Sequence, residues 1–172
     1  MSIKIEVIRN SRRRKTCSAQ LKDDVIIVRI PRRMSQEQEK KAVKELTERI
    51  LKRQHREKLN REHSLTDRAR SLCRKYLGVD PPVESVQFVT NQNSCFGSCS
   101  VGTGKIRISH RLENAPGWVL DYVLIHEMAH LVHGNHSRAF YQLLDKYPMA
   151  ERARGFLIAL SFIPDDSNDI LV

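Results

Sequence analysis

The pattern of hydrophobic and polar positions predicts three strands at the start of the chain. Apolar residues alternate with charged ones over Ile3–Val7, which is the period of a half-buried strand. A β-branched run at Val25–Ile30 predicts another strand, and Thr16–Leu21 fits between the two. With Lys22–Asp24 as a turn, we expect these strands to form an N-terminal β-meander.

Two helices are expected next, because the hydrophobic spacing changes to that of a helix. Ser35–Leu59 opens with the serine and glutamine of a capping box and continues with apolar residues at helical intervals. A second helix is expected over Ser64–Gly78, where the final glycine suits a left-handed cap. The Asp80–Pro82 break then predicts a boundary between residues 1–80 and 83–172.

The pattern in the second half of the chain predicts a hairpin followed by helices. Val83–Thr90 has a strand pattern, and a glycine-rich turn precedes the returning strand Lys105–Ser109. Such a hairpin can offer its edge to an extended peptide. Trp118–Val132 is apolar nearly all round, which predicts a buried helix. Further helices are expected over 136–147 and 149–162, with a loose polar tail over 164–169, so the expected fold class is α+β.

The buried helix carries the sequence HEMAHLVHGNH at residues 126–136. His126 and His130 are four residues apart, so both imidazoles lie on one helical face, about 6 Å apart along the axis. Gly134 and Asn135 break the helix and allow His136 to turn back toward it. Three imidazoles with one open position are a ligand set of catalytic zinc. We therefore expect His126, His130 and His136 to bind one zinc ion per chain.

Glu127, next to the first histidine, is expected to act as the catalytic general base. In such sites the carboxylate removes a proton from water, which attacks a carbonyl carbon. The alternative is that the three histidines only pack in a core. That alternative leaves Glu127 buried without a partner, which is costly, so the spacing favours a metal site that hydrolyses peptide bonds.

Other polar residues near this motif have less defined roles. His133 is seven residues after His126 and a turn beyond the second ligand, so we expect it at the surface or behind the ligands. His110 is expected to be structural or exposed to solvent. Three residues are equal candidates for stabilising the oxyanion: Tyr122, Arg138 and Tyr141.

Charge adds a possible second function. The 172 residues have a net charge of +10, and the basic residues are concentrated before residue 76. Such a field attracts nucleic acid, although a solvated basic face is the favoured interpretation because no base-reading pattern accompanies it. The N-terminus lacks a secretory signal and no run of 18 apolar residues occurs. We expect a cytoplasmic protein without a membrane partner, with its four cysteines reduced.

Several segments resemble the YgjP-type metallopeptidases, a group of small SprT-like zinc hydrolases. These segments are the arginine-rich N-terminal strands, the hairpin QFVTNQNSCFGSCSVGTGKIRISHRL, the run WVLDYVLIHEMAHLVHGNHSRAFYQLLDKYP and the closing ERARGFL. The resemblance implies a zincin-like domain with zinc on His126, His130 and His136 and with Glu127 as base. It also implies a protein or peptide substrate, and some SprT-like relatives act on proteins crosslinked to DNA.

The hairpin departs from the family pattern at one place. The family usually has Arg-Trp-Gly-Ser-Cys, whereas Cys95 and Phe96 occupy the first two positions here and Gly97–Cys99 is retained. The loss of that arginine puts a substrate-carboxylate or salt-bridge role in doubt. No other cysteine pair completes a four-ligand set with Cys95 and Cys99, so a second metal is not expected.

The sequence therefore predicts a zinc-dependent metallopeptidase that hydrolyses peptide bonds. The alternative is a basic, nucleic-acid-associated protein in which the metal site is secondary or inactive, or a protease that acts on DNA-bound proteins.

Overall fold

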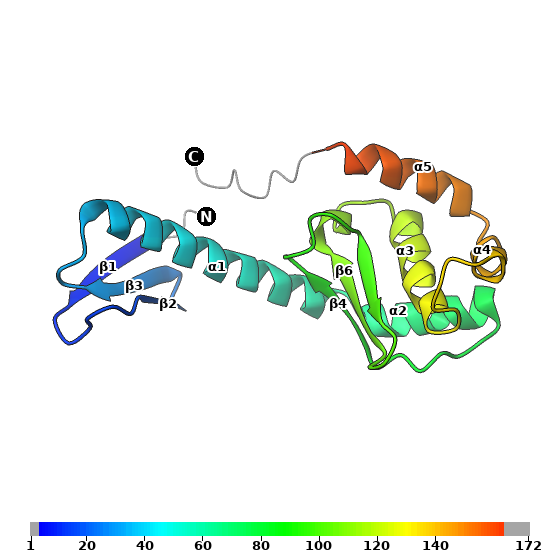
Figure 1. Ribbon diagram of the computed structural model, residues 1–172, viewed down its shortest axis with the longest axis horizontal. Coiled ribbons are helices and arrows are strands. Elements are labelled where there is room, and N and C mark those ends of the chain that lie inside the picture. The colour runs from blue at the N-terminus through cyan, green and yellow to red at the C-terminus, as the bar shows by residue number, and fades with distance from the viewer. Residues whose placement is uncertain (1–3, 164–172) are drawn as a thin grey trace. The chain divides into compact units, whose positions relative to one another are not determined.

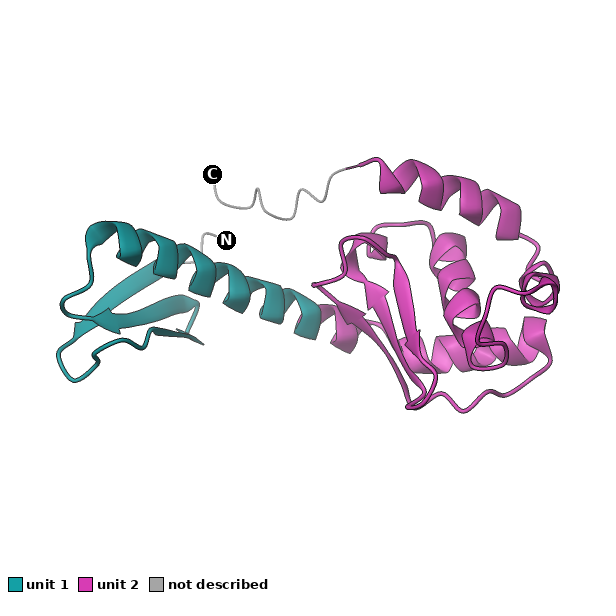
Figure 2. Ribbon diagram, viewed as in Figure 1, with its two compact units in different colours: residues 1–57 teal, residues 58–172 magenta. Residues whose placement is uncertain are grey.

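The computed structural model describes residues 4–163 of the chain. The chain divides into an N-terminal unit, Met1–Glu57, and a C-terminal unit, Lys58–Val172 (Figure 2). The division lies inside the long helix α1 (Gln36–Glu62) and not at the Asp80–Pro82 break. The physical reason is that apolar residues between 59 and 77 belong to the core of the C-terminal unit.

The N-terminal unit contains a three-stranded sheet in the order β1-β3-β2 (Figure 1). Its strands are β1 (Lys4–Asn10), β2 (Ser18–Lys22) and β3 (Val25–Pro31). β2 and β3 form a hairpin, but β1 pairs parallel with β3, so the expected meander is wrong in its connectivity. The seven residues 11–17 are too many for a tight turn, and the chain passes from β1 to the far side of β3. Ile3 of the expected first strand lies outside the described residues.

Alternation along β3 creates the core of this unit. Ile26, Val28 and Ile30 are fully buried, and apolar residues of α1, including Val43 and Leu46, pack against them. Period two in the strand and the helical period in α1 thus direct both apolar faces to one interior.

The expected capping box starts α1. The Ser35 hydroxyl accepts a hydrogen bond from the Gln38 amide at 3.3 Å, and the Gln38 side-chain oxygen accepts one from the Ser35 amide at 3.4 Å. The capping box thereby satisfies the amides of Ser35 and Gln38.

The C-terminal unit combines a second three-stranded sheet with helices (Figure 1). Its elements are α2 (Leu65–Leu72), the π-helical turn η1 (Cys73–Leu77), β4 (Ser85–Val89), β5 (Gly97–Ser100), β6 (Lys105–Ser109), the 3-10 turn η2 (His110–Leu112), α3 (Gly117–His130), α4 (Arg138–Leu144) and α5 (Ala150–Ser161). The sheet order is β4-β6-β5, with β5 antiparallel and β4 parallel to β6. The expected hairpin of Val83–Thr90 with Lys105–Ser109 is wrong in its pairing, because β4 runs parallel to β6 and the antiparallel partner of β6 is β5. The glycine-containing turn over 101–104 joins β5 to β6, and residues 90–96 carry the chain from β4 to the far side of β6.

Helix α3 is the central element of this unit, as its all-round apolar sequence predicts. It packs against β5 and β6 as well as α2, α4 and α5. Nine of its residues are buried, and Glu127 is the charged one among them. None of the helices within residues 4–163 combines the length and the apolar character that crossing a membrane requires.

The outer edge of β4 is closed by side chains. Asn60 donates to the Phe88 carbonyl at 3.0 Å and accepts from the Phe88 amide at 2.8 Å. Thr66 accepts from the Val86 amide at 2.9 Å and donates to the Val86 carbonyl at 3.4 Å. These side chains replace a neighbouring strand, and the other edge of the sheet, β5, lies beside α3.

Candidate metal centre

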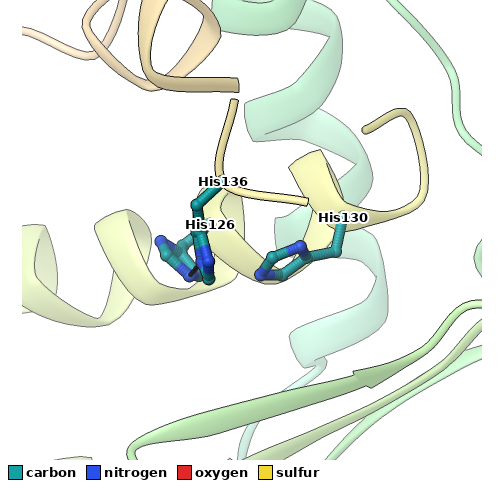
Figure 3. Close-up of side chains that lie close together, drawn as sticks. All are labelled: His126, His130 and His136. Atoms are coloured by element: carbon teal, nitrogen blue, oxygen red, sulfur yellow. Dashed lines mark hydrogen bonds between the residues drawn. The ribbon is translucent and has the colours of Figure 1, made fainter. Parts of the chain in front are cut away.

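The structure brings together the three histidines that the sequence selected. His126 and His130 project from the last turns of α3, and His136 reaches toward them from the following loop (Figure 3). One ring nitrogen from each histidine lies within 4.8 Å of the others. The Nε2 atoms of His126 and His136 are 3.3 Å apart.

The loop that positions His136 is held at both ends. After α3 ends, the amides of Val132 and His133 both donate to the Ala129 carbonyl, at 3.0 and 2.8 Å. On the other side, Ser137 caps α4 because its hydroxyl accepts a hydrogen bond from the amide of residue 140 at 3.3 Å. The third histidine therefore lies between two anchored helix ends.

A phenylalanine ring packs against all three imidazoles of the cluster. Phe140 is fully buried, and its ring centroid lies 5.0 Å from that of His126, 4.6 Å from His130 and 4.8 Å from His136. The Tyr141 ring stacks on His136 with a centroid distance of 6.2 Å. These contacts restrict the rotation of the imidazoles, so the donor atoms are held in place by packing.

Burial favours the neutral form of His126 and His130. It lowers the pKa of His126 to about 4, and the charges of His130, His136 and Arg154 act in the same direction. The pKa of His130 is also lowered by burial and by His136, while a backbone hydrogen bond with His133 opposes that shift. Neutral imidazole is the form that coordinates metal ions.

Glu127 lies on the side of α3 that faces the sheet. It is 6% exposed, and burial raises its pKa to about 7. A Cβ placed on Gly97 of β5 would lie only 2.8 Å from Cγ and from Cδ of Glu127, and closer still to Oε1. The carboxylate therefore fits against bare backbone. Burial raises the pKa of the Cys99 thiol, two residues further along β5, to about 11. The charge of Glu127 contributes to the same shift.

The other residues considered from the sequence are placed as follows. His133 is half-buried and is not part of the histidine group, and His110 is buried in η2. Among residues 4–163, the histidine cluster is the one group of three or more His, Cys, Asp or Glu side chains suited to a metal, so Cys95 and Cys99 form no second set.

The candidates for oxyanion stabilisation differ in their surroundings. Tyr122 is buried and its hydroxyl accepts a hydrogen bond from Arg154 Nε at 3.0 Å. Tyr141 is 45% exposed and Arg138 is exposed. All three stay candidates.

Three residues of the site were not identified from the sequence. Phe140 was covered only by the expected helix over 136–147, and its distance of four residues from His136 was the available signal. Gly97 and Arg154 both lie in segments that resemble the family, but those segments do not reveal their roles, which depend on residues about 30 positions away in the chain.

Together, the three converging histidines, the buried glutamate and the adjacent edge strand are the features of a metallopeptidase domain. A family model described as "YgjP-like, metallopeptidase domain" matches residues 61–157, and the chain belongs to this family. No match to a curated protein was found. The chain is also similar to the crystal structure of the metallopeptidase zymogen of Pyrococcus abyssi abylysin, with 26% identity and a TM-score of 0.48. That match covers 56% of this chain and 90% of the other.

Proposed function

We propose that the protein is a zinc-dependent metallopeptidase in which His126, His130 and His136 hold the metal. The observation that carries this proposal is the convergence of their three nitrogens within 4.8 Å. The donor set fits zinc, because nitrogens bound tetrahedrally at about 2.0–2.1 Å are separated by about 3.3–3.4 Å. The 3.3 Å between the Nε2 atoms of His126 and His136 agrees with that separation.

The chemistry assigns Glu127 the role of general base. When bound, zinc in such a site supplies Lewis acidity that makes water acidic near neutral pH and polarises a carbonyl group. Glu127 takes the proton of the attacking water and then returns it to the amine nitrogen of the departing peptide. Its burial, with a pKa of about 7, suits both proton transfers near neutrality.

The edge of β5 is the proposed binding site for an extended peptide. The Ser109 amide donates to the Phe96 carbonyl at 2.9 Å, which makes that opposing pair a hydrogen-bonded one. Since bonded and non-bonded pairs alternate in an antiparallel ladder, the N–H and C=O groups of Gly97 and Cys99 point to the open edge. A peptide that pairs with them lies beside Glu127, which contacts Gly97.

The test combines metal analysis with peptide cleavage. We expect about one zinc per chain in protein prepared without chelators, and loss of cleavage in Glu127→Gln with zinc retained. Glu84→Gln is the matched control, since it removes the same charge from an exposed residue whose ion-pair partner is Lys105. Protein without zinc, or a Glu127→Gln variant as active as the control, contradicts the proposal.

A second candidate function, nucleic-acid binding, is favoured by the uneven distribution of charge. Residues 1–57 contain 17 Lys and Arg against 8 Asp and Glu, a net charge of +9, whereas residues 58–172 contain 13 against 12. Within the loop between β1 and β2, Arg12, Arg14 and Lys15 are exposed. This concentration supports the proposal that the N-terminal unit binds the phosphate backbone of DNA.

Salt-dependent binding to a labelled DNA duplex tests this second function. Affinity is expected to fall steeply with salt, and alanine at all four positions of Arg12–Lys15 is expected to reduce the slope of log K against log salt by about 3–4. Alanine at Arg74 and Lys75, in the other unit, is the control for general loss of charge. Absence of binding at low salt, or an unchanged slope in the quadruple variant, excludes this function.

A further inference from the structure

Arg154 of α5 connects three helical segments around the histidine cluster. Its Nε donates to the Tyr122 hydroxyl of α3 at 3.0 Å, and its Nη2 pairs with Asp145, the residue after α4, also at 3.0 Å. Its Nη1 pairs with Glu151. The guanidinium carbon also lies 5.7 Å from the ring centre of Tyr122 and 5.8 Å from that of Tyr141. One side chain thus holds two tyrosines from different helices.

Those two tyrosines are neighbours of the proposed metal ligands. The Tyr122 ring centroid is 6.1 Å from that of His126, one helical turn away on α3. The Tyr141 ring stacks on His136 at 6.2 Å with an interplanar angle of 29°. Arg154 therefore contacts one tyrosine that neighbours the first ligand and one that neighbours the third.

We infer that Arg154 is a positioning residue for the metal centre, which it orders through Tyr122 and Tyr141. The inference rests on the proposed metallopeptidase function. A guanidinium suits this role because its planar set of donors serves Tyr122 and Asp145 at once while its face contacts the aromatic rings. Because the Tyr122 oxygen accepts from Arg154, the proton of that hydroxyl stays available for donation to another acceptor.

Arg152 provides a matched control on the same helix. It is exposed, and its guanidinium carbon lies 5.6 Å from the ring centre of Trp118, a contact of the same type away from the histidines. Arg152→Ala and Arg154→Ala therefore each remove one arginine and its aromatic contact from α5. A difference between them reports on the surroundings of the histidines and not on charge or helix content.

The first experiment measures kcat and KM for cleavage of one peptide by wild type, Arg154→Ala, Arg154→Lys and Arg152→Ala. Residues behind metal ligands change activity or metal affinity by about 10–100-fold. We expect kcat/KM to fall by that factor in Arg154→Ala, through kcat, with KM unchanged. Arg154→Lys should recover part of the loss, since lysine keeps the positive charge but lacks the planar set of donors. Arg152→Ala should equal wild type.

The second experiment examines the metal centre by a measurement that does not depend on catalysis. The cobalt-substituted protein reports ligand geometry through its visible absorption. We expect Arg154→Ala to change this spectrum and to weaken zinc retention against a competing chelator, and Arg152→Ala to change neither. If the effect passes through Tyr122, the Tyr122→Phe and Arg154→Ala changes will be non-additive in a double-mutant cycle.

The outcomes separate this inference from the function on which it rests. A wild-type protein without metal or cleavage contradicts the proposed function. An active wild type together with an Arg154→Ala variant that matches Arg152→Ala in kcat and in cobalt spectrum overturns the role of Arg154. If Arg154→Ala does not fold, Arg154→Lys and Tyr122→Phe take its place in both experiments. The inference is overturned if both of these variants have the kcat and the cobalt spectrum of wild type.

Discussion

Substitution of Gly97 by alanine tests the packing of Glu127 against β5. An alanine Cβ would lie 2.8 Å from Cγ and Cδ of the glutamate, whereas ordinary contact begins at 3.4 Å. The two carbon atoms must therefore move by about 0.6 Å relative to the strand, and Oε1 by more. Because Glu127 is only 6% exposed, the side chain has little free space to enter.

The size of this displacement determines how far kcat is expected to fall. Misplacing a reacting group by about 1 Å can reduce the rate about 100-fold, so we expect kcat to fall by about 10–100-fold in Gly97→Ala. Overpacking in a well-packed region typically costs about 1–3 kcal/mol of unfolding free energy. Zinc content should stay at the wild-type level, because the atoms nearest to the added Cβ belong to Glu127 and not to a histidine.

The assay compares peptide cleavage, zinc content and urea unfolding of Gly97→Ala with those of Gly102→Ala. Gly102 lies in the turn of the same hairpin, and a Cβ there meets nothing within 4 Å. In a Glu127→Ala background the Gly97→Ala substitution should no longer destabilise the protein, because the clashing side chain is gone. Equal kcat and stability in the two glycine variants would refute the proposed packing of Glu127.

Three further predictions concern pH, the third ligand and the cysteines. In metal-free Glu127→Gln, the pKa of His126 lies near 4 in the folded state and near 6.5 in the unfolded state. Urea unfolding should therefore show roughly 3 kcal/mol of stability that is full above pH 6.5 and lost toward pH 4. In metal-free wild type, Glu127 opposes this slope because its raised pKa of about 7 favours folding at low pH, so the profile should be flatter. Ser137→Ala removes the cap of α4 and should cost about 1 kcal/mol of unfolding free energy and accelerate zinc loss to a chelator. A thiol reagent should label exposed Cys95 before buried Cys73, whose pKa burial raises to about 12, and mass spectrometry of digests will show the order.

The features that depend on local spacing could be predicted from the sequence. The capping box at Ser35 and the apolar sequence of α3 each need only residues within a few turns. The convergence of His126, His130 and His136 follows from a four-residue helical interval and one chain break. The metal-site inference, for example, rests on geometry that is fixed within the eleven residues 126–136.

The features that depend on distant segments could not be predicted. Parallel pairing of β1 with β3 requires the loop between β1 and β2 to pass over the sheet, and no turn residue encodes that path. Arg154 and Gly97 acquire their roles only when α5 and β5 pack beside α3. The expected boundary at Asp80–Pro82 followed a local proline signal, whereas the units are defined by burial of residues on either side of it.

The closure of β4 by Asn60 affects how the catalytic region can be produced on its own. The family match begins at residue 61, but Leu59 is 1% exposed in the core of the C-terminal unit and Asn60 binds both backbone groups of Phe88. A chain trimmed to the family match loses both residues. The backbone groups of Phe88 are then left unpaired, while Thr66 still covers Val86. Such a partly open edge can recruit the same edge of a second molecule, so self-association is the expected defect of that shortened protein.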